Sequence, residues 1–226
     1  MSSLEAQPTV YVVDDDEAIR TLWRWLMESN GIAVQTFAGA REFIQGYRAR
    51  GPACLVLDLR LPGMSGLELQ EYLKRRDIEI PVVFVTGHGD VPTAVNAIKG
   101  GAVDFIQKPF SYRDVLAIID KALRRDAQAC ARRAQRSQAS ARLAALTKRE
   151  RDVLRRIIEG KANKVSAGEL AISVKTVEFH RARVMEKMQA GSVAELVQLA
   201  LSAAADVDSL REDLGFPRMD AGRRDG

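Results

Sequence analysis

The sequence predicts two folded parts: a doubly wound α/β domain with a five-stranded parallel sheet, followed by an all-α domain of four short helices. In the first half, five short apolar runs alternate with segments whose apolar residues recur at helical spacing. In the second half, four helical segments follow one another with brief turns between them. The halves also differ in charge, because residues 1–120 carry 12 Lys+Arg and 16 Asp+Glu, whereas residues 121–226 carry 22 and 14.

Length and composition limit the class of protein. The 226 residues are enough for two domains that each bury a core, and 46% hydrophobic with 28% charged residues is ordinary for a soluble globular protein. The N-terminus lacks the pattern of a secretion signal, no apolar run is long enough to span a bilayer, and the two cysteines have no metal or redox spacing. We therefore expect a cytoplasmic protein without membrane contact, whose basic second half binds a polyanion.

The predicted strands are short and mostly apolar. They are Thr9–Val13, Ile32–Phe37, Cys54–Leu57, Val82–Val85 and Val103–Ile106. The run Cys54–Leu57 is apolar throughout and is followed by turn residues, which is typical of a central parallel strand, although the pattern alone leaves a buried helix open. Helical segments connect successive strands, so we expect parallel strands with helices on both faces of the sheet.

Start and stop signals place five helices after these strands. The first helix follows Asp14–Asp16 and stops at Asn30-Gly31, and its apolar face consists of Ile19, Leu22, Trp23 and Leu26. The second helix ends near Tyr47, and the third covers Gly66–Arg76. Asp90 caps the fourth helix, which ends at Lys99, and Ser111 and Asp114 resemble a capping box for the fifth. We expect this first domain to cover residues 8–122.

Residues 123–142 contain few large apolar side chains and neither Gly nor Pro. This composition leaves two alternatives open, a helical extension of the fifth helix or a flexible linker. The second domain is expected over residues 143–203, and the polar residues 204–226 are expected to be disordered. Its helices begin at a capping box Thr147-x-x-Glu150, at Asn163, after the cap Ser173, and at a capping box Ser192-x-x-Glu195.

Polar side chains follow four of the predicted strands. Asp14–Asp16 follow the first strand, Asp58 the third, Thr86 the fourth and Lys108 the fifth. Open α/β sheets place ligands at the carboxyl ends of their strands, so we expect these groups to lie at one edge. Several carboxylates there favour Mg²⁺, an Asp beside the metal is a nucleophile for phosphorus, and Lys and Thr bind phosphoryl oxygens. Each residue alone would be read as a helix cap or a solvated loop residue; the four positions together favour a phosphoryl site.

The helix that follows Ser173 has the pattern of a DNA recognition helix in a helix-turn-helix bundle. Val177, Val184 and Met188 share one apolar face. The predicted DNA contacts are the polar residues Lys175, Thr176, Glu178, Arg181, Arg183 and Lys187. An ordinary amphipathic surface helix is the alternative for this segment alone, and His180 is as consistent with packing inside the bundle as with DNA contact.

Both halves resemble known families. The segments VVDDD, LVLDLRLPGMSGLEL and VVFVTGHGDVPTAVNAIKGGAVDFIQKPF resemble the response-regulator receiver domain over about half of the chain. The segment LTKRERDVLRRIIEGKANK and the later LAISVKTVEFHRARVMEKM resemble the LuxR-type helix-turn-helix. TGHGDVPTAV and the carboxyl half are particularly similar to the FixJ subgroup of response regulators.

The receiver resemblance implies roles for single residues. Asp58 would be the phosphoacceptor, and Mg²⁺ would bind Asp14, Asp15, Asp58 and the Arg60 carbonyl, with Asp15 the more direct ligand of the acidic pair. Thr86 would be the switch hydroxyl, Phe105 the rotating aromatic residue and Lys108 the phosphate-binding lysine. Lys108-Pro109 would be a cis peptide bond, and Asp16 would serve only as a helix cap.

The resemblance also implies partners. A sensor histidine kinase would phosphorylate Asp58, the phosphorylated chain would form a homodimer, and the dimer would bind double-stranded promoter DNA and regulate transcription. RNA polymerase stays open as a further partner. Dimerisation is expected on the surface around residues 91–100 and 111–120, with the segment 121–146 setting the reach of the two DNA-binding domains.

One departure from the LuxR-type pattern concerns the first helix of the motif. Ser166 stands where the family usually has a buried Ile, which predicts a loss of packing on the order of 1–3 kcal/mol. We expect Val165 to rotate inward and compensate.

Two other function classes are consistent with parts of the sequence. A metal-dependent phosphohydrolase could use Asp58 as its nucleophile, but Leu59-Arg60 follow it and no second acid stands two residues later to serve as general acid or base. A non-DNA module, such as a phosphate sink or an RNA-binding regulator, is the third possibility. The polar face of the predicted recognition helix favours DNA, so we expect a transcription factor and not an enzyme.

Overall fold

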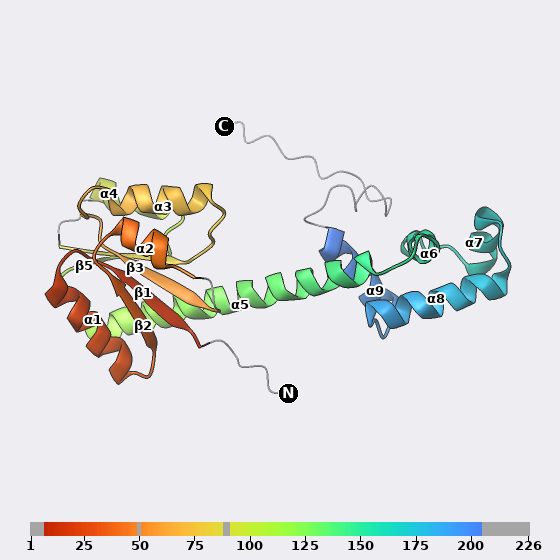
Figure 1. Ribbon diagram of the computed structural model, residues 1–226, viewed down its shortest axis with the longest axis horizontal. Helices are drawn as coiled ribbons and strands as arrows, with labels where there is room; N and C mark the ends of the chain where they lie inside the picture. The colour runs from red at the N-terminus through yellow and green to blue at the C-terminus, as the bar shows by residue number, and fades with distance from the viewer. Residues whose placement is uncertain (1–6, 49–50, 88–90, 205–226) are drawn as a thin grey trace. The chain divides into compact units, whose positions relative to one another are not determined.

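The computed structural model describes residues 7–48, 51–87 and 91–204. The first half contains a five-stranded sheet in the order β2-β1-β3-β4-β5, and every pair of neighbouring strands is parallel (Figure 1). The strands are β1 (Thr9–Val13), β2 (Ala33–Phe37), β3 (Ala53–Leu57), β4 (Val82–Thr86) and β5 (Asp104–Gln107). The predicted doubly wound sheet is therefore confirmed, and the run that contains Cys54–Leu57 is its central strand and not a helix.

Alternation along the strands builds one core on each face of this sheet. Tyr11 and Val13 of β1 pack into one core, and Val10 and Val12 pack into the other. The first core is covered by α2 (Ala40–Gly46), α3 (Gly66–Arg75) and α4 (Val91–Lys99), and the second by α1 (Glu17–Ser29) and the start of α5 (Tyr112–Ala144). Figure 1 shows these helices on the two sides of the strands. The expected cap Asp90 lies outside the described residues.

The helix α5 belongs to both halves of the chain. The chain divides into two compact units between Ala131 and Arg132, which is inside this helix. Its first part contributes Val115, Ile119 and Ala122 to the core under the sheet. Residues 123–142, for which the sequence left helix and flexible linker open, are helical throughout.

A buried aspartate anchors α5 to the sheet. The Asp126 side chain is almost fully buried, and its Oδ2 accepts a hydrogen bond of 2.7 Å from the backbone N–H of Ala53, the first residue of β3. The Cys130 Sγ lies 3.6 Å from the same oxygen. Without Asp126, the buried N–H of Ala53 would lose this acceptor and its desolvation would not be compensated. The hydrogen bond therefore ties α5 to the start of β3.

The second unit is a helical bundle. It comprises α6 (Lys148–Ile158), α7 (Asn163–Leu170), α8 (Val174–Met188) and α9 (Val193–Ala204). Thr147 and Glu150 form the predicted capping box, and Ser173 caps α8. The core joins Leu154, Ile157, Val184, Met188 and Leu196 with Ala139 and Leu143 from the end of α5. Residues 205–226, most of the segment for which we expected disorder, lie outside the described residues. None of the helices in the described ranges combines the length and the apolar character needed to cross a bilayer.

The expected compensation for Ser166 is not observed. Val165 does not turn inward, because half of its surface, 50%, is exposed. Ser166 is itself buried at 1% exposure, and its Oγ donates a hydrogen bond of 3.1 Å to the Ala162 carbonyl. A hydroxyl with a partner one helical turn earlier carries no large burial penalty, so α7 accommodates the serine by satisfying its polar group.

The anchor at Asp126 gives a stability prediction. Replacing Asp126→Ala leaves the buried Ala53 N–H without this acceptor and is expected to lower the free energy of unfolding of the first unit by about 1–3 kcal/mol. Both tryptophans, Trp23 and Trp25, lie in this unit, so urea unfolding followed by tryptophan fluorescence reports on it alone. Asp120→Ala is the matched control on the same helix, because the Asp120–Arg124 ion pair is exposed and an exposed ion pair contributes little to stability. Equal effects of the two substitutions would contradict the anchor.

Candidate functional site

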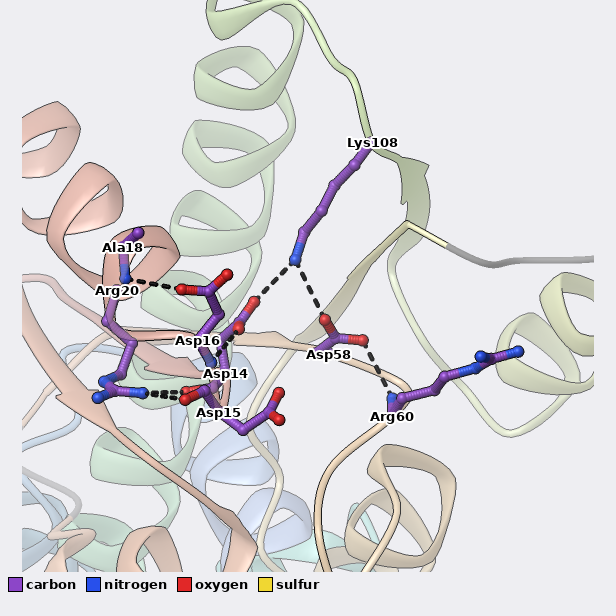
Figure 2. A network of polar contacts seen from close by, with 8 residues as sticks. All are labelled: Asp14, Asp15, Asp16, Ala18, Arg20, Asp58, Arg60 and Lys108. Atoms are coloured by element: carbon purple, nitrogen blue, oxygen red, sulfur yellow. Dashed lines mark hydrogen bonds and ion pairs between the residues drawn. The ribbon is translucent and has the colours of Figure 1, made fainter.

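Three strands bring two carboxylates and one ammonium group together. Val13 and Leu57 are paired in the register of β1 and β3, so Asp14 and Asp58 leave the sheet side by side. The Lys108 Nζ, just after β5, lies 2.8 Å from Asp14 Oδ2 and 3.1 Å from Asp58 Oδ2 (Figure 2). The lysine therefore bridges two acids that are 44 positions apart in the sequence.

These charges lie in a largely dehydrated environment. The side chains of Asp14, Asp58 and Lys108 are 5%, 12% and 20% exposed. Burial raises the pKa of Asp14 above its usual range, and the hydrogen bond from Lys108 offsets only part of this effect. Burial alone would lower the pKa of Lys108, but its contacts with Asp14 and Asp58 raise it, so the ammonium form is favoured. Two carboxylates share one cation, which leaves the site short of positive charge.

The backbone around Asp58 is closely constrained. Its N–H donates to the Val13 carbonyl at 2.9 Å, and its Oδ1 accepts a hydrogen bond of 3.0 Å from the Arg60 N–H. A Cβ at Gly66, the first residue of α3, would collide with the Asp58 carbonyl oxygen. Gly66 is therefore needed where α3 approaches the acid, a requirement that our sequence analysis missed.

The loop after β1 is held by an arginine that the sequence analysis also missed. The Arg20 Nη1 donates to the carbonyls of Asp14 and Asp15 at 2.7 and 2.8 Å (Figure 2). Asp16 caps α1 by accepting from the Ala18 N–H, as expected from the sequence. Arg20 on the first turn of α1 thus orients the two backbone units that carry the acids. An arginine six positions after Asp14 gives no signal in the sequence that distinguishes this contact from ordinary solvation.

The acids fit the donor chemistry of a hard cation without forming a complete cage. Within the described ranges, no three His, Cys, Asp or Glu side chains are gathered closely enough to hold a metal ion, and Asp15 is exposed. Mg²⁺ takes oxygen ligands and keeps several waters, so one or two carboxylates are a sufficient protein contribution. Asp14 and Asp58 are largely buried and share one ammonium group, so their remaining negative charge suits such an ion.

The remaining residues predicted for this edge lie on β4 and β5. Thr86 ends β4 and is 1% exposed, and its carbonyl accepts a hydrogen bond of 2.8 Å from the Lys108 N–H. Phe105 on β5 is half-buried against the core that α2, α3 and α4 cover. The Lys108-Pro109 peptide bond is cis, as the receiver resemblance implied.

The second candidate surface is the outer side of α8. Val177, Val184 and Met188 are buried, and the other side of the helix faces solvent. Of the predicted DNA contacts, Lys175, Glu178 and Arg183 are exposed, whereas Thr176, Arg181 and Lys187 are half-buried. The Ser173 and Thr176 hydroxyls lie 2.7 Å apart at the start of the helix.

Lys187 has a partner inside its own domain. Its Nζ lies 2.7 Å from Oε2 of Glu150, whose side chain is only 7% exposed. Although burial of Glu150 acts in the opposite direction, the hydrogen bonds from Lys187 and Thr147 hold its pKa below the usual range. Lys187 therefore joins α8 to the start of α6.

Two family models match the chain on either side of the unit boundary. The model of the response regulator receiver domain matches residues 10–120, which contain the sheet-edge cluster. The model of the bacterial regulatory proteins of the luxR family matches residues 144–200, which contain α8.

Individual relatives match across both units. Transcriptional regulatory protein FixJ of Azorhizobium caulinodans is 44% identical over 194 residues, which is 86% of this chain and 92% of that protein. Among solved structures, response regulator StyR aligns with a TM-score of 0.79 and 44% identity over 86% of this chain and 98% of that chain. Full-length FixJ from B. japonicum aligns with a TM-score of 0.52 and 42% identity over 87% and 97% of the two chains.

The chain matches the receiver-domain model, the luxR-family model and FixJ proteins over most of its length. It therefore belongs to the FixJ group of response regulators, which are transcription regulators with a receiver domain and a LuxR-type DNA-binding domain.

Proposed function

We propose that a sensor histidine kinase phosphorylates this chain at Asp58 and that phosphorylation controls promoter binding by α8. The observation that carries this proposal is the bridge from Lys108 to Asp14 and Asp58. It supplies a carboxylate nucleophile and, within hydrogen-bond distance of it, a cation for the phosphoryl oxygens. The side chain of Asp58 is also more exposed than that of Asp14, so a donor phosphate has better access to Asp58.

The transfer step is a displacement at phosphorus. A carboxylate oxygen of Asp58 forms a bond to the phosphorus of the kinase phosphohistidine while the N–P bond breaks, and the electron pair of that bond stays on the imidazole nitrogen. Lys108 then exchanges a carboxylate partner for a phosphoryl oxygen. Mg²⁺ held by Asp14, Asp15, Asp58 and the Arg60 carbonyl would neutralise charge on the phosphoryl group during transfer. Thr86, at the end of the neighbouring strand β4, would donate its hydroxyl to the product.

The alternative of a phosphohydrolase with its own substrates is less well supported. Leu59 is buried and Arg60 is an exposed cation, so the positions after Asp58 offer no general acid or base. The transcription-regulator family and the basic second unit favour a regulator without enzymatic turnover. They also favour duplex DNA over RNA as the polyanion. RNA polymerase is a further partner that the proposal leaves open.

We propose a homodimer as the active form. The phosphoryl group adds charge that Lys108 and Thr86 capture, which biases β4, β5 and the helices that follow them, and Phe105 turns inward. Exposed apolar side chains lie on these helices: Val95 and Ile98 on α4 are 44% and 47% exposed, and Tyr112 at the start of α5 is 48% exposed. A second copy would cover this surface and bring two DNA-binding units to adjacent half-sites.

Phosphorylation is predicted to require both Asp58 and a divalent cation. With a small acyl-phosphate donor and Mg²⁺, the wild-type chain should gain one phosphoryl group by intact-mass measurement, and EDTA should prevent this gain. Asp58→Asn should take up none, because an amide is not a nucleophile for phosphorus. Asp16→Asn is the matched control, since Asp16 only caps α1. Full labelling of Asp58→Asn at the wild-type rate would contradict the assignment.

Dimerisation is predicted to follow phosphorylation. Sedimentation should show a shift from monomer to dimer when the donor and Mg²⁺ are added. Ile98→Ser should accept phosphate and stay largely monomeric, because it places a hydroxyl in the apolar surface. Thr86→Ala should also accept phosphate but dimerise weakly, because the buried hydroxyl at the end of β4 is lost. A chain that gains DNA affinity on phosphorylation while remaining a monomer would refute the dimer mechanism.

DNA binding is predicted to depend on the exposed cations of α8. Lys175→Gln should weaken binding of the full chain to duplex DNA and reduce the slope of log affinity against log salt by about 0.9, the value for one lost phosphate contact. Lys74→Gln on α3 is a matched exposed lysine in the first unit and should leave the slope unchanged. An unchanged slope for Lys175→Gln would remove this residue from the interface. Lys187 is a poor test residue because its loss also unpairs the buried Glu150.

A further inference from the structure

The outermost line of α8 contains a large aromatic side chain. Lys175, Phe179, Ala182 and Glu186 follow one another at helical spacing and are all exposed. Phe179 is 58% exposed, whereas the apolar residues Val177, Val184 and Met188 of the same helix are at most 1% exposed. Other side chains of α8 therefore face the core. Its phenylalanine faces solvent in the middle of the proposed DNA-binding surface.

Neighbouring side chains hold this ring in place without covering it. The Arg183 guanidinium carbon lies 5.7 Å from the centre of the Phe179 ring, within the range of a cation–π contact. Arg183 is in turn fixed by an ion pair of 2.8 Å from its Nη1 to Glu186 Oε2. The His180 ring lies 5.6 Å from the Phe179 ring, with 66° between the planes. These contacts limit the rotamers of Phe179 before any partner binds, which lowers the entropy lost on binding.

The chemistry of this line matches one feature of duplex DNA. Lys175, one turn before the ring, supplies positive charge that suits a phosphate backbone, whereas the charge of Arg183 is paired with Glu186. The faces of paired bases are stacked on one another, so an aromatic ring in the major groove meets base edges. The apolar group on those edges is the 5-methyl group of thymine. An exposed apolar ring one turn after a cation therefore matches a thymine methyl group beside the phosphate backbone.

We propose that Phe179 contacts a thymine 5-methyl group in the major groove and makes that base a specificity determinant of each half-site. This inference rests on the proposed function, because it requires α8 to enter the groove. Arg183 acts as a positioning residue for the ring. The contact excludes water from one methyl group, so its loss should weaken binding about fourfold, the factor expected for one buried methyl or methylene group.

Deoxyuridine substitution tests the contact directly. Duplexes are first selected from a randomised pool with the full-length chain in the presence of the phosphodonor and Mg²⁺. Each thymine of the selected duplex is then replaced, one at a time, by deoxyuridine, which pairs identically and lacks only the methyl group. One particular thymine in each half-site should be sensitive, and replacing either of these two alone should weaken binding by the wild-type chain about fourfold.

Variants assign the methyl effect to Phe179. Phe179→Ala should bind the thymine and deoxyuridine duplexes equally, and Phe179→Leu should retain part of the difference because it keeps an apolar side chain. Trp25→Ala is the matched control, since Trp25 is an exposed aromatic residue, 62% exposed, in the first unit. It should retain the full difference. Unchanged helix content and thermal unfolding are expected for Phe179→Ala because its side chain is largely exposed.

Several outcomes would overturn the inference, and they are distinct from failure of the proposed function. Wild-type binding that is indifferent to every thymine methyl removes the contact without the use of any variant. Phe179→Ala that keeps the wild-type difference removes it from this residue. A variant that loses dimerisation in the absence of DNA and keeps the methyl effect assigns the ring to a second copy of the chain. Failure of the wild-type chain to bind any duplex from the pool would instead refute promoter binding itself.

Discussion

A single ammonium group shared by two buried carboxylates is the interaction on which the first unit depends. Lys108 reaches Asp14 and Asp58 only because β1, β3 and β5 end at the same edge of the sheet, in the order that the crossover helices impose. The arrangement is electrostatically incomplete, because burial already raises the pKa of Asp14 with the lysine in place. Two acids near one cation favour the binding of further positive charge. Negative charge added at Asp58, as proposed, would change the contacts that Lys108 makes with both acids.

The sequence predicted that Asp14, Asp58 and Lys108 lie together, because each of them directly follows a strand. An apolar run followed by an acid is visible in the sequence, and parallel strands force such acids to one edge. The contacts that refine the site were not predictable in the same way. Arg20 donates to two backbone carbonyls, and Gly66 leaves room for the Asp58 carbonyl, yet neither residue stands out by type or spacing. Their roles arise from where the chain returns in space.

Residues 123–142 show a different limit of the sequence. Good helix formers without Gly or Pro favoured helix, but a lack of large apolar residues left a flexible linker open. The structure has a helix whose few buried positions belong to two cores: Leu123 and Asp126 pack at the sheet, and Ala139 packs in the second unit. Residues 131–138 between these two ends are all exposed and still helical, so tertiary packing holds the ends of the segment and the intrinsic preference of its good helix formers accounts for the middle.

The same limit explains the two surprises on α8. Residue type predicted that a lysine at position 187 would face DNA and gave no role to a phenylalanine at position 179. Lys187 stays a predicted DNA contact, but it also reaches Glu150, a partner that residue type did not indicate. Phe179 lies one turn after Lys175 on the exposed line. The cation therefore strengthens the bundle and the aromatic ring faces solvent. In the proposed complex, cations on this helix would attract any duplex through its phosphates, and the exposed phenylalanine would add an apolar contact that distinguishes the thymine methyl group from the other base edges.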